Sequence, residues 1–130
     1  MNDRGCKAVG IDLGTTYSAL AFVDAQNTPR IMCDGNGQAV MPSVVFFDHD
    51  EVIVGEMALS QAKVHADRAV QFIKAHMGEA WRKTFNGQEH TPESISALIL
   101  CQLIREAEPQ LGVVKDAVIT VPAFFTEKRR

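Results

Sequence analysis

Cysteine is scarce in this 130-residue chain, and no apolar run is long enough to cross a bilayer. Its three cysteines, Cys6, Cys33 and Cys101, are an odd number at wide spacing, which excludes a disulfide framework. The longest apolar runs, such as residues 97–101, are far shorter than the roughly 20 residues that a transmembrane helix needs. Four of the first twelve residues are charged, which leaves no room for a signal peptide. We therefore expect a cytoplasmic protein with no membrane partner.

An excess of positive charge is also lacking. Thirteen Lys and Arg against sixteen Asp and Glu give a net charge of -3, so no cationic field attracts nucleic acid. The four histidines are scattered and show no metal-ligand spacing. With 46% hydrophobic and 22% charged residues, the chain can bury a core, which excludes disorder. The length indicates one domain at most, or a piece of one.

The N-terminal third predicts strands without intervening helices. Apolar residues 8–13 and 17–23 flank a Gly-Thr-Thr turn at 14–16, a pattern typical of a hairpin. Residues 30–33 predict a third strand before a strong break. Three consecutive strands argue against a doubly wound parallel sheet and favour a mixed α/β fold with antiparallel hairpins and flanking helices.

The middle of the chain predicts a second hairpin and two short helices. The hairpin covers residues 43–47 and 52–54. A helix then begins at Glu56, and the 3.6-residue period places Met57, Ala58, Ala62 and Val64 on one face. A second short helix is predicted over residues 70–76, ending at Gly78.

The clearest predicted helix follows Thr91, a good N-cap, with Pro92 in the first position. Pro109 and Gly112 are predicted to end it, and residues 117–121 form a β-branched strand. The apolar period places one stripe of residues on the buried face of the helix: Ile95, Leu98, Ile99, Gln102 and Leu103.

Residues 126–130 have the composition of a helix N-terminus. Thr126 is a good cap, and Glu127 suits the positive end of the helix dipole. Because the chain stops there, we expect it to be a piece of a larger domain.

The segment 10–18 is the most informative for chemistry. Asp12, at the end of a predicted buried strand, needs a partner, and a hydrated Mg²⁺ is a suitable one. Gly14 lets the backbone bend closely around a ligand, and Thr15 and Thr16 offer N–H groups and hydroxyls to phosphate oxygens. The spacing matches neither a P-loop nor a dinucleotide fingerprint. On these residues alone, an ordinary hairpin is an equal alternative.

Three segments in the right order resemble the seventy-kilodalton heat-shock (DnaK-type) chaperones. They are residues 8–18, residues 41–47 with the later Val54-Gly55, and residues 118–125. The resemblance implies an actin-like ATPase (ribonuclease H-like) fold, with ATP or ADP and Mg²⁺ between two lobes. The chain would be the N-terminal part of the nucleotide-binding domain, in lobe I.

The resemblance also implies a division of residues 1–130 into two subdomains. Residues 1–38 and 113–130 would form the core subdomain, and residues 39–112 the peripheral one. Between Gly78 and Pro92 the chain is shorter than typical members, which predicts fewer peripheral strands.

Site residues follow from the resemblance, residue by residue. Asp12 would lie near Mg²⁺ and its waters, and Lys74 near the γ-phosphate, as the two catalytic residues. Pro122 and Arg130 would relay the nucleotide state to a peptide-binding domain. Around Lys74 this chain reads Phe-Ile-Lys-Ala where the family reads Asp-Ala-Lys-Arg, so that assignment depends on distance from Asp12. The phosphates would be lined by Gly14, Thr15, Thr16 and Tyr17.

The function implied is that of an ATP-dependent chaperone, whose hydrolysis of ATP gates the binding of unfolded peptide clients and involves co-chaperones. Nucleotide is the expected ligand, and this piece alone is expected to be inactive. The alternative is a non-hydrolysing nucleotide-binding relative, or an actin-like filament or scaffold protein, because one superfold hosts many functions. The sequence Thr-Thr-Tyr-Ser at residues 15–18 favours a chaperone over an actin-like protein.

Overall fold

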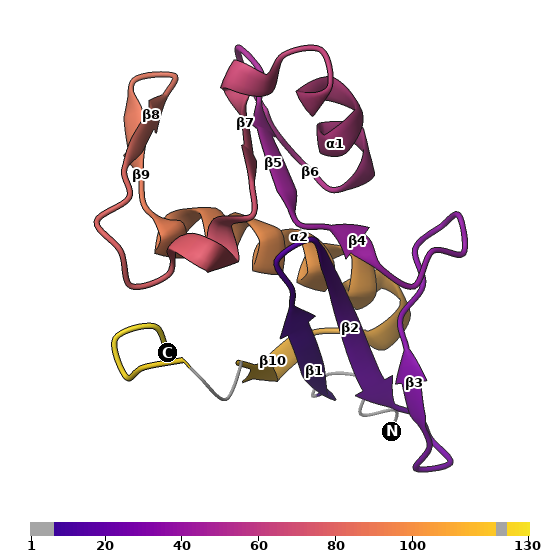
Figure 1. Ribbon diagram of the computed structural model, residues 1–130. Helices are drawn as coiled ribbons and strands as arrows, with labels where there is room; N and C mark the ends of the chain where they lie inside the picture. Colours follow the sequence, from indigo (N-terminus) through magenta and orange to yellow (C-terminus); the bar gives the residue numbers. More distant parts are fainter. Residues whose placement is uncertain (1–6, 122–124) are drawn as a thin grey trace.

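The computed structural model describes residues 7–121 and 125–130, and its largest sheet is mixed, as predicted (Figure 1). β1 pairs antiparallel with β2 and parallel with β10, while β4 extends the sheet beside β2. The parallel pair joins the two ends of the described chain. In the order β10-β1-β2-β3, with β4 off that path, the strands are β1 (Lys7–Leu13), β2 (Tyr17–Val23), β3 (Pro29–Ile31), β4 (Met41–Pro42) and β10 (Val114–Thr120).

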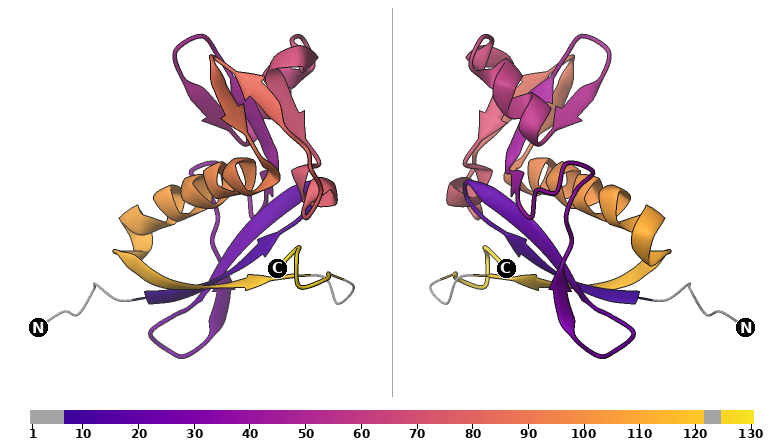
Figure 2. Two further views of the ribbon diagram at one scale, coloured as in Figure 1. Left: turned by 90° about the vertical axis from the view of Figure 1, so that its left-hand side faces the viewer. Right: turned by 90° about the vertical axis from the view of Figure 1, so that its right-hand side faces the viewer.

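A second sheet and a separate hairpin lie on the other side of the long helix α2 (Pro92–Leu111) (Figures 1 and 2). The sheet has the order β6-β5-β7, from β5 (Val44–Phe47), β6 (Val52–Val54) and β7 (Ala69–Gln71). The hairpin consists of β8 (Lys83–Phe85) and β9 (Gln88–His90). The remaining elements are helix α1 (Glu56–Ala62) and the 3₁₀ helices η1 (Ala66–Arg68) and η2 (Ile73–His76). None of the helices in the described residues is long and apolar enough to cross a membrane.

The buried face of α2 joins the two sheets into one core. Ile95, Ile99 and Leu103 are buried in a single cluster with residues of β1, β2 and β5. The predicted cap is confirmed: Thr91 Oγ1 accepts from the Ser94 amide at 3.1 Å, and Ser94 Oγ accepts from the Thr91 amide at 2.9 Å. This cap fixes where the helix starts above the main sheet.

The end of α2 differs from the prediction. The helix continues through Pro109 and stops at Gly112, the C-cap, which has a φ of 81°. A proline this close to the end removes only one hydrogen bond of the last turn. The positive φ favours glycine and is what ends the helix.

The helix predicted over residues 70–76 is wrong in its first half. Val70 lies in β7 and pairs with Val45 of β5, and only Ile73–His76 are helical. Pairing with β5 buries Val70 (5% exposed), and this non-local gain outweighs the local helical pattern.

Three smaller expectations are corrected. Met57 is 68% exposed, and Val64 lies beyond the end of α1 and is 73% exposed, so only Ala58 and Ala62 of the predicted face are buried. The third strand is Pro29–Ile31, so it begins and ends earlier than residues 30–33. In the described residues 125–130 there is a turn in place of a helix, in which two amides donate to the Thr126 carbonyl oxygen.

The hairpin β8–β9 lies in the segment that the sequence analysis expected to be poor in strands. Asn86 and Gly87 connect its strands with φ angles of 50° and 79°, the left-handed values that a two-residue hairpin turn needs. The Phe85 ring stacks on Phe47 of β5 at 4.2 Å between centroids, and Asn86 Nδ2 donates to the Asp48 carbonyl. An aromatic contact and a side-chain hydrogen bond therefore attach the hairpin to β5.

Candidate functional site

The turn between β1 and β2 is held closed by one serine from the β4–β5 junction. Ser43 Oγ donates to the Gly14 carbonyl oxygen at 2.9 Å, and the Ser43 amide donates to the Thr16 carbonyl oxygen at 2.9 Å. Ser18 Oγ lies 2.8 Å from Ser43 Oγ, and both serines are buried. Ser43 thus ties both sides of the turn to the second sheet.

Gly14 is required by space within the turn. A Cβ built on Gly14 would come closer than 3.0 Å to the Tyr17 carbonyl oxygen and within 3.2 Å of its carbonyl carbon. The φ of Gly14 lies outside the left-handed region, so the need for glycine comes from crowding. The sequence analysis attributed this glycine to the approach of a ligand, whereas the structure shows a reason within the turn itself.

The residues that follow Gly14 face an open depression. Thr15, Thr16 and Tyr17 are exposed and line a hollow of about 240 Å³, which we call the turn hollow. Ser43 and Phe72 line it from the other side. Exposed hydroxyls beside a tight turn offer hydrogen bonds to an oxyanion.

Asp12 lies opposite Thr120 in the parallel pair β1–β10. Thr120 Oγ1 donates to Asp12 Oδ1 at 3.3 Å. The expectation that Asp12 is buried is wrong, because its side chain is exposed at the end of β1. An exposed carboxylate oriented by one hydroxyl suits a hydrated Mg²⁺, which keeps most of its waters. Among the described residues no group of three or more His, Cys, Asp or Glu side chains gathers as a metal site.

Lys74 lines a second depression, a hollow of about 230 Å³ that we call the lysine hollow. Its Nζ lies 5.8 Å from the centroid of the Phe125 ring, and Lys74 is half-buried. Thr120, the hydrogen-bond partner of Asp12, and Arg130 line the same hollow. The structure therefore brings Lys74 and Arg130 together on the Asp12 side, but not into the hollow that Thr15–Tyr17 line. Pro122 lies outside the described residues.

Phe72 lies at the edge of the turn hollow, two residues before Lys74. It has a φ of 59°, a left-handed conformation that a bulky residue seldom adopts, and its side chain is 51% exposed. Phe72 lines the turn hollow, and two residues later Lys74 lines the lysine hollow. The strained residue thus ends β7 and redirects the chain so that one short segment borders both hollows.

Sequence reasoning missed the roles of Ser43 and Phe72. In the sequence, Ser43 stands out only as part of the segment 41–47 that resembles the chaperone family. The available signal was a small polar residue directly before four consecutive apolar residues, 44–47, because a buried hydroxyl needs hydrogen-bond partners. The backbone conformation of Phe72 has no signal in its residue type.

The sequence also matches the model of a protein family. The model of the Hsp70 protein family matches residues 8–86 and 82–130, which include both hollows and the Asp12 region. This chain belongs to the Hsp70 family. A chaperone-type nucleotide-binding role follows from that membership, and the mixed α/β architecture agrees with a lobe of an actin-like ATPase.

Proposed function

We propose that this Hsp70-family chain binds ATP or ADP with Mg²⁺, and that it hydrolyses ATP when a second lobe completes the site. The observation that carries the proposal is the exposed turn of Thr15 and Thr16, closed from behind by Ser43 and adjacent to the Asp12 carboxylate. A rigid turn with exposed donors binds phosphate oxygens without first having to be ordered, which is what preorganisation requires.

In this proposal the turn and Asp12 divide the binding of the nucleotide. The hydroxyls of Thr15 and Thr16 and the backbone of the turn contact the β- and γ-phosphate region. The Asp12 carboxylate accepts hydrogen bonds from the waters of the metal ion, and the Thr120 hydroxyl keeps that carboxylate oriented. When bound, Mg²⁺ neutralises charge on the phosphates.

Lys74 is proposed to stabilise the charge of the transferring phosphoryl group and to position the attacking water. To do so its ammonium group must leave the face of the Phe125 ring, where it lies 5.8 Å from the centroid. A cation–π contact of this kind contributes about 0.5–1 kcal/mol at an exposed site. Contacts with a polyphosphate would offset a loss of this size.

The remaining parts of the proposal concern the cycle of a chaperone. Hydrolysis would gate the binding of unfolded peptide clients, with co-chaperones as further partners, in the cytoplasm. Arg130, which lines the lysine hollow, supports a relay from that hollow, and Pro122 is proposed as its second member. The division into a core subdomain, 1–38 with 113–130, and a peripheral subdomain, 39–112, is supported by two separate sheets, although β4 pairs with β2.

One observation favours the alternative of nucleotide binding without hydrolysis, in a non-hydrolysing relative or an actin-like scaffold. Lys74 and Thr15–Tyr17 line different hollows, and the Lys74 ammonium already has a partner in Phe125. If that arrangement persists with nucleotide bound, the γ-phosphate lacks this cation.

The two functions are separated by measuring ATP turnover and ATP affinity in two proteins. One is the 130-residue chain, and the other is this chain joined to a second Hsp70 lobe. We expect turnover only in the two-lobed protein, since adenine contacts and further phosphate contacts must come from outside this chain. Tight binding without turnover in the two-lobed protein would favour the alternative. Steady hydrolysis by the 130-residue chain, after controls for contaminants, would overturn the proposed division of the site.

A further inference from the structure

A groove of about 420 Å³ lies apart from both hollows and shares only Pro42 with either of them. It runs along β4, β6, the start of α1 and one side of α2. Among its described lining residues there is no lysine, arginine or histidine. Four carboxylates line it: Asp34, Glu51, Glu56 and Glu106. We call this feature the acidic groove.

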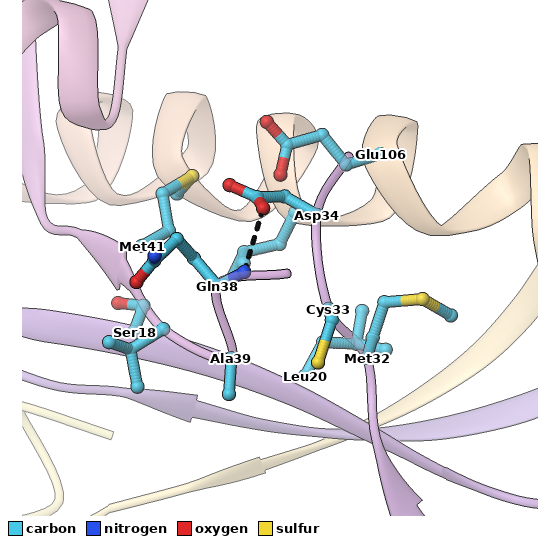
Figure 3. Close-up of a pocket in the computed structure, with 11 residues that line it drawn as sticks. Ser18, Leu20, Met32, Cys33, Asp34, Gln38, Ala39, Met41 and Glu106 are labelled. Carbon is cyan, nitrogen blue, oxygen red and sulfur yellow. Dashed lines mark hydrogen bonds between the residues drawn. The ribbon is translucent and has the colours of Figure 1, made fainter. Parts of the chain in front are cut away.

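None of these carboxylates has a cationic partner among the described side chains, whose ion pairs all involve other acids. The Asp34 carboxylate accepts hydrogen bonds from the backbone amides of Asn36 and Gln38. The Glu106 carboxylate accepts a hydrogen bond from Gln102 Nε2 at 3.0 Å. Figure 3 shows Asp34 and Glu106, from distant parts of the chain, both lining a small cavity next to the groove. Like charges thus face a common space with no countercharge, which makes a negative potential.

Three apolar residues that line the acidic groove are exposed, and we call them together the apolar rim. Val40 is 47% exposed, Val52 is 44% exposed and Met57 is 68% exposed. Met57 is the residue that the helical pattern predicted to be buried. A flexible methionine suits a surface that adapts to another chain, and β6, which supplies Val52, is an edge strand of its sheet.

We propose that the acidic groove docks a basic amphipathic helical segment of a protein partner, with lysine or arginine side chains beside large apolar ones. The apolar side chains would cover Val40, Val52 and Met57, and the cations would compensate the four carboxylates. Charge complementarity selects this occupant, because the same potential repels anionic lipid and nucleic acid. A small cation would leave the apolar rim exposed, so it does not account for the groove.

The test uses the 130-residue chain and a fluorescent synthetic peptide of leucine and lysine, spaced to form an amphipathic helix. Binding is measured by fluorescence anisotropy, with oligolysine of equal length as the comparison peptide. The groove variants are Met57→Ser and the pair Glu51→Lys with Glu106→Lys. The matched controls lie outside the groove: Val64→Ser, at a residue that is 73% exposed, and the pair Glu108→Lys with Asp116→Lys, which changes the net charge equally.

We expect each groove variant to weaken peptide binding about tenfold or more, and each control to change it by less than about threefold. Oligolysine should bind at least about tenfold more weakly than the amphipathic peptide, since it cannot cover the apolar rim. Circular dichroism verifies the fold of every variant. If the charge-reversal pair does not fold, Met57→Ser against Val64→Ser decides. Equal weakening by groove and control variants, equal affinity for oligolysine, or no binding of the peptide to the wild-type chain would each overturn the proposal.

Discussion

Replacing Gly14 by alanine tests whether the turn between β1 and β2 is too tight for a side chain at this position. The new Cβ would lie closer than 3.0 Å to the Tyr17 carbonyl oxygen and 3.2 Å from its carbonyl carbon, and both are backbone atoms that cannot rotate away. The turn must therefore open. Opening it displaces the Gly14 and Thr16 carbonyl groups from Ser43, whose hydroxyl and amide donate to them at 2.9 Å.

The size of the effect follows from three contributions. Overpacking in a well-packed place costs about 1–3 kcal/mol. Weakening one or two hydrogen bonds adds about 1 kcal/mol. Alanine also restricts the unfolded chain, which offsets about 0.4–1 kcal/mol. The net expectation for Gly14→Ala is a free energy of unfolding lower by about 2 kcal/mol, and a Tm lower by roughly 6–10 °C for a domain of this size.

Urea unfolding followed by tryptophan fluorescence measures this directly, because Trp81 is the one tryptophan and packs against the core. Gly35→Ala is the matched control, since a Cβ there meets nothing within 4 Å and its φ lies outside the left-handed region. The control should stay within about 0.5 kcal/mol of the wild type. If Gly14→Ala is as stable as Gly35→Ala, the crowding at Tyr17 and the role of Ser43 in closing the turn are both refuted.

Three further predictions concern other residues. Ser43→Ala should lower the free energy of unfolding by about 1–3 kcal/mol, because the buried Ser18 hydroxyl loses its partner; an unchanged denaturation midpoint would contradict this. In a two-lobed protein, Lys74→Ala should keep most ATP binding but slow single-turnover hydrolysis on the order of a hundredfold. The control Lys63→Ala, at an exposed residue, should leave both ATP binding and hydrolysis unchanged. Near-normal hydrolysis in the Lys74 variant would assign the role elsewhere. Burial lowers the pKa of His90 below its ordinary 6.5, so as the pH drops through 6.5 the imidazole takes up a proton more readily in the unfolded chain than in the native one. The free energy of unfolding therefore falls as the pH drops through 6.5. His90→Phe should flatten that fall in unfolding curves recorded between neutral and mildly acidic pH, and equal slopes for both proteins would exclude His90 as its source.

The parts of the fold that the sequence predicts correctly are those set by local signals. The β1–β2 hairpin follows from apolar segments around Gly-Thr-Thr, and α2 from the Thr91 cap, Pro92 and a regular stripe. The errors lie where distant pairing decides. Val70 fits a helical period, but it pairs with Val45 of β5. Met57 fits the buried face of α1, but its side chain lines the acidic groove.

The candidate site divides in the same way. The motif of residues 12–17 identifies the turn and the carboxylate, because these residues are adjacent in the sequence. The position of the Lys74 ammonium depends on the Phe125 ring, and the closure of the turn depends on Ser43, both far along the chain from their partners. The asparagine–glycine pair at 86–87 is a local hairpin signal that the sequence reasoning did not use.

The turn of Gly14–Tyr17 is proposed to bind nucleotide phosphates, with Asp12 beside it. The most direct measurement is a titration of the ¹⁵N-labelled chain with ATP and Mg²⁺, followed by amide chemical shifts. We predict weak, millimolar binding, with the largest shift changes at residues 12–17, and their loss in Gly14→Ala. Changes confined to other parts of the chain, or none at residues 12–17 at the highest nucleotide concentration, would contradict the claim.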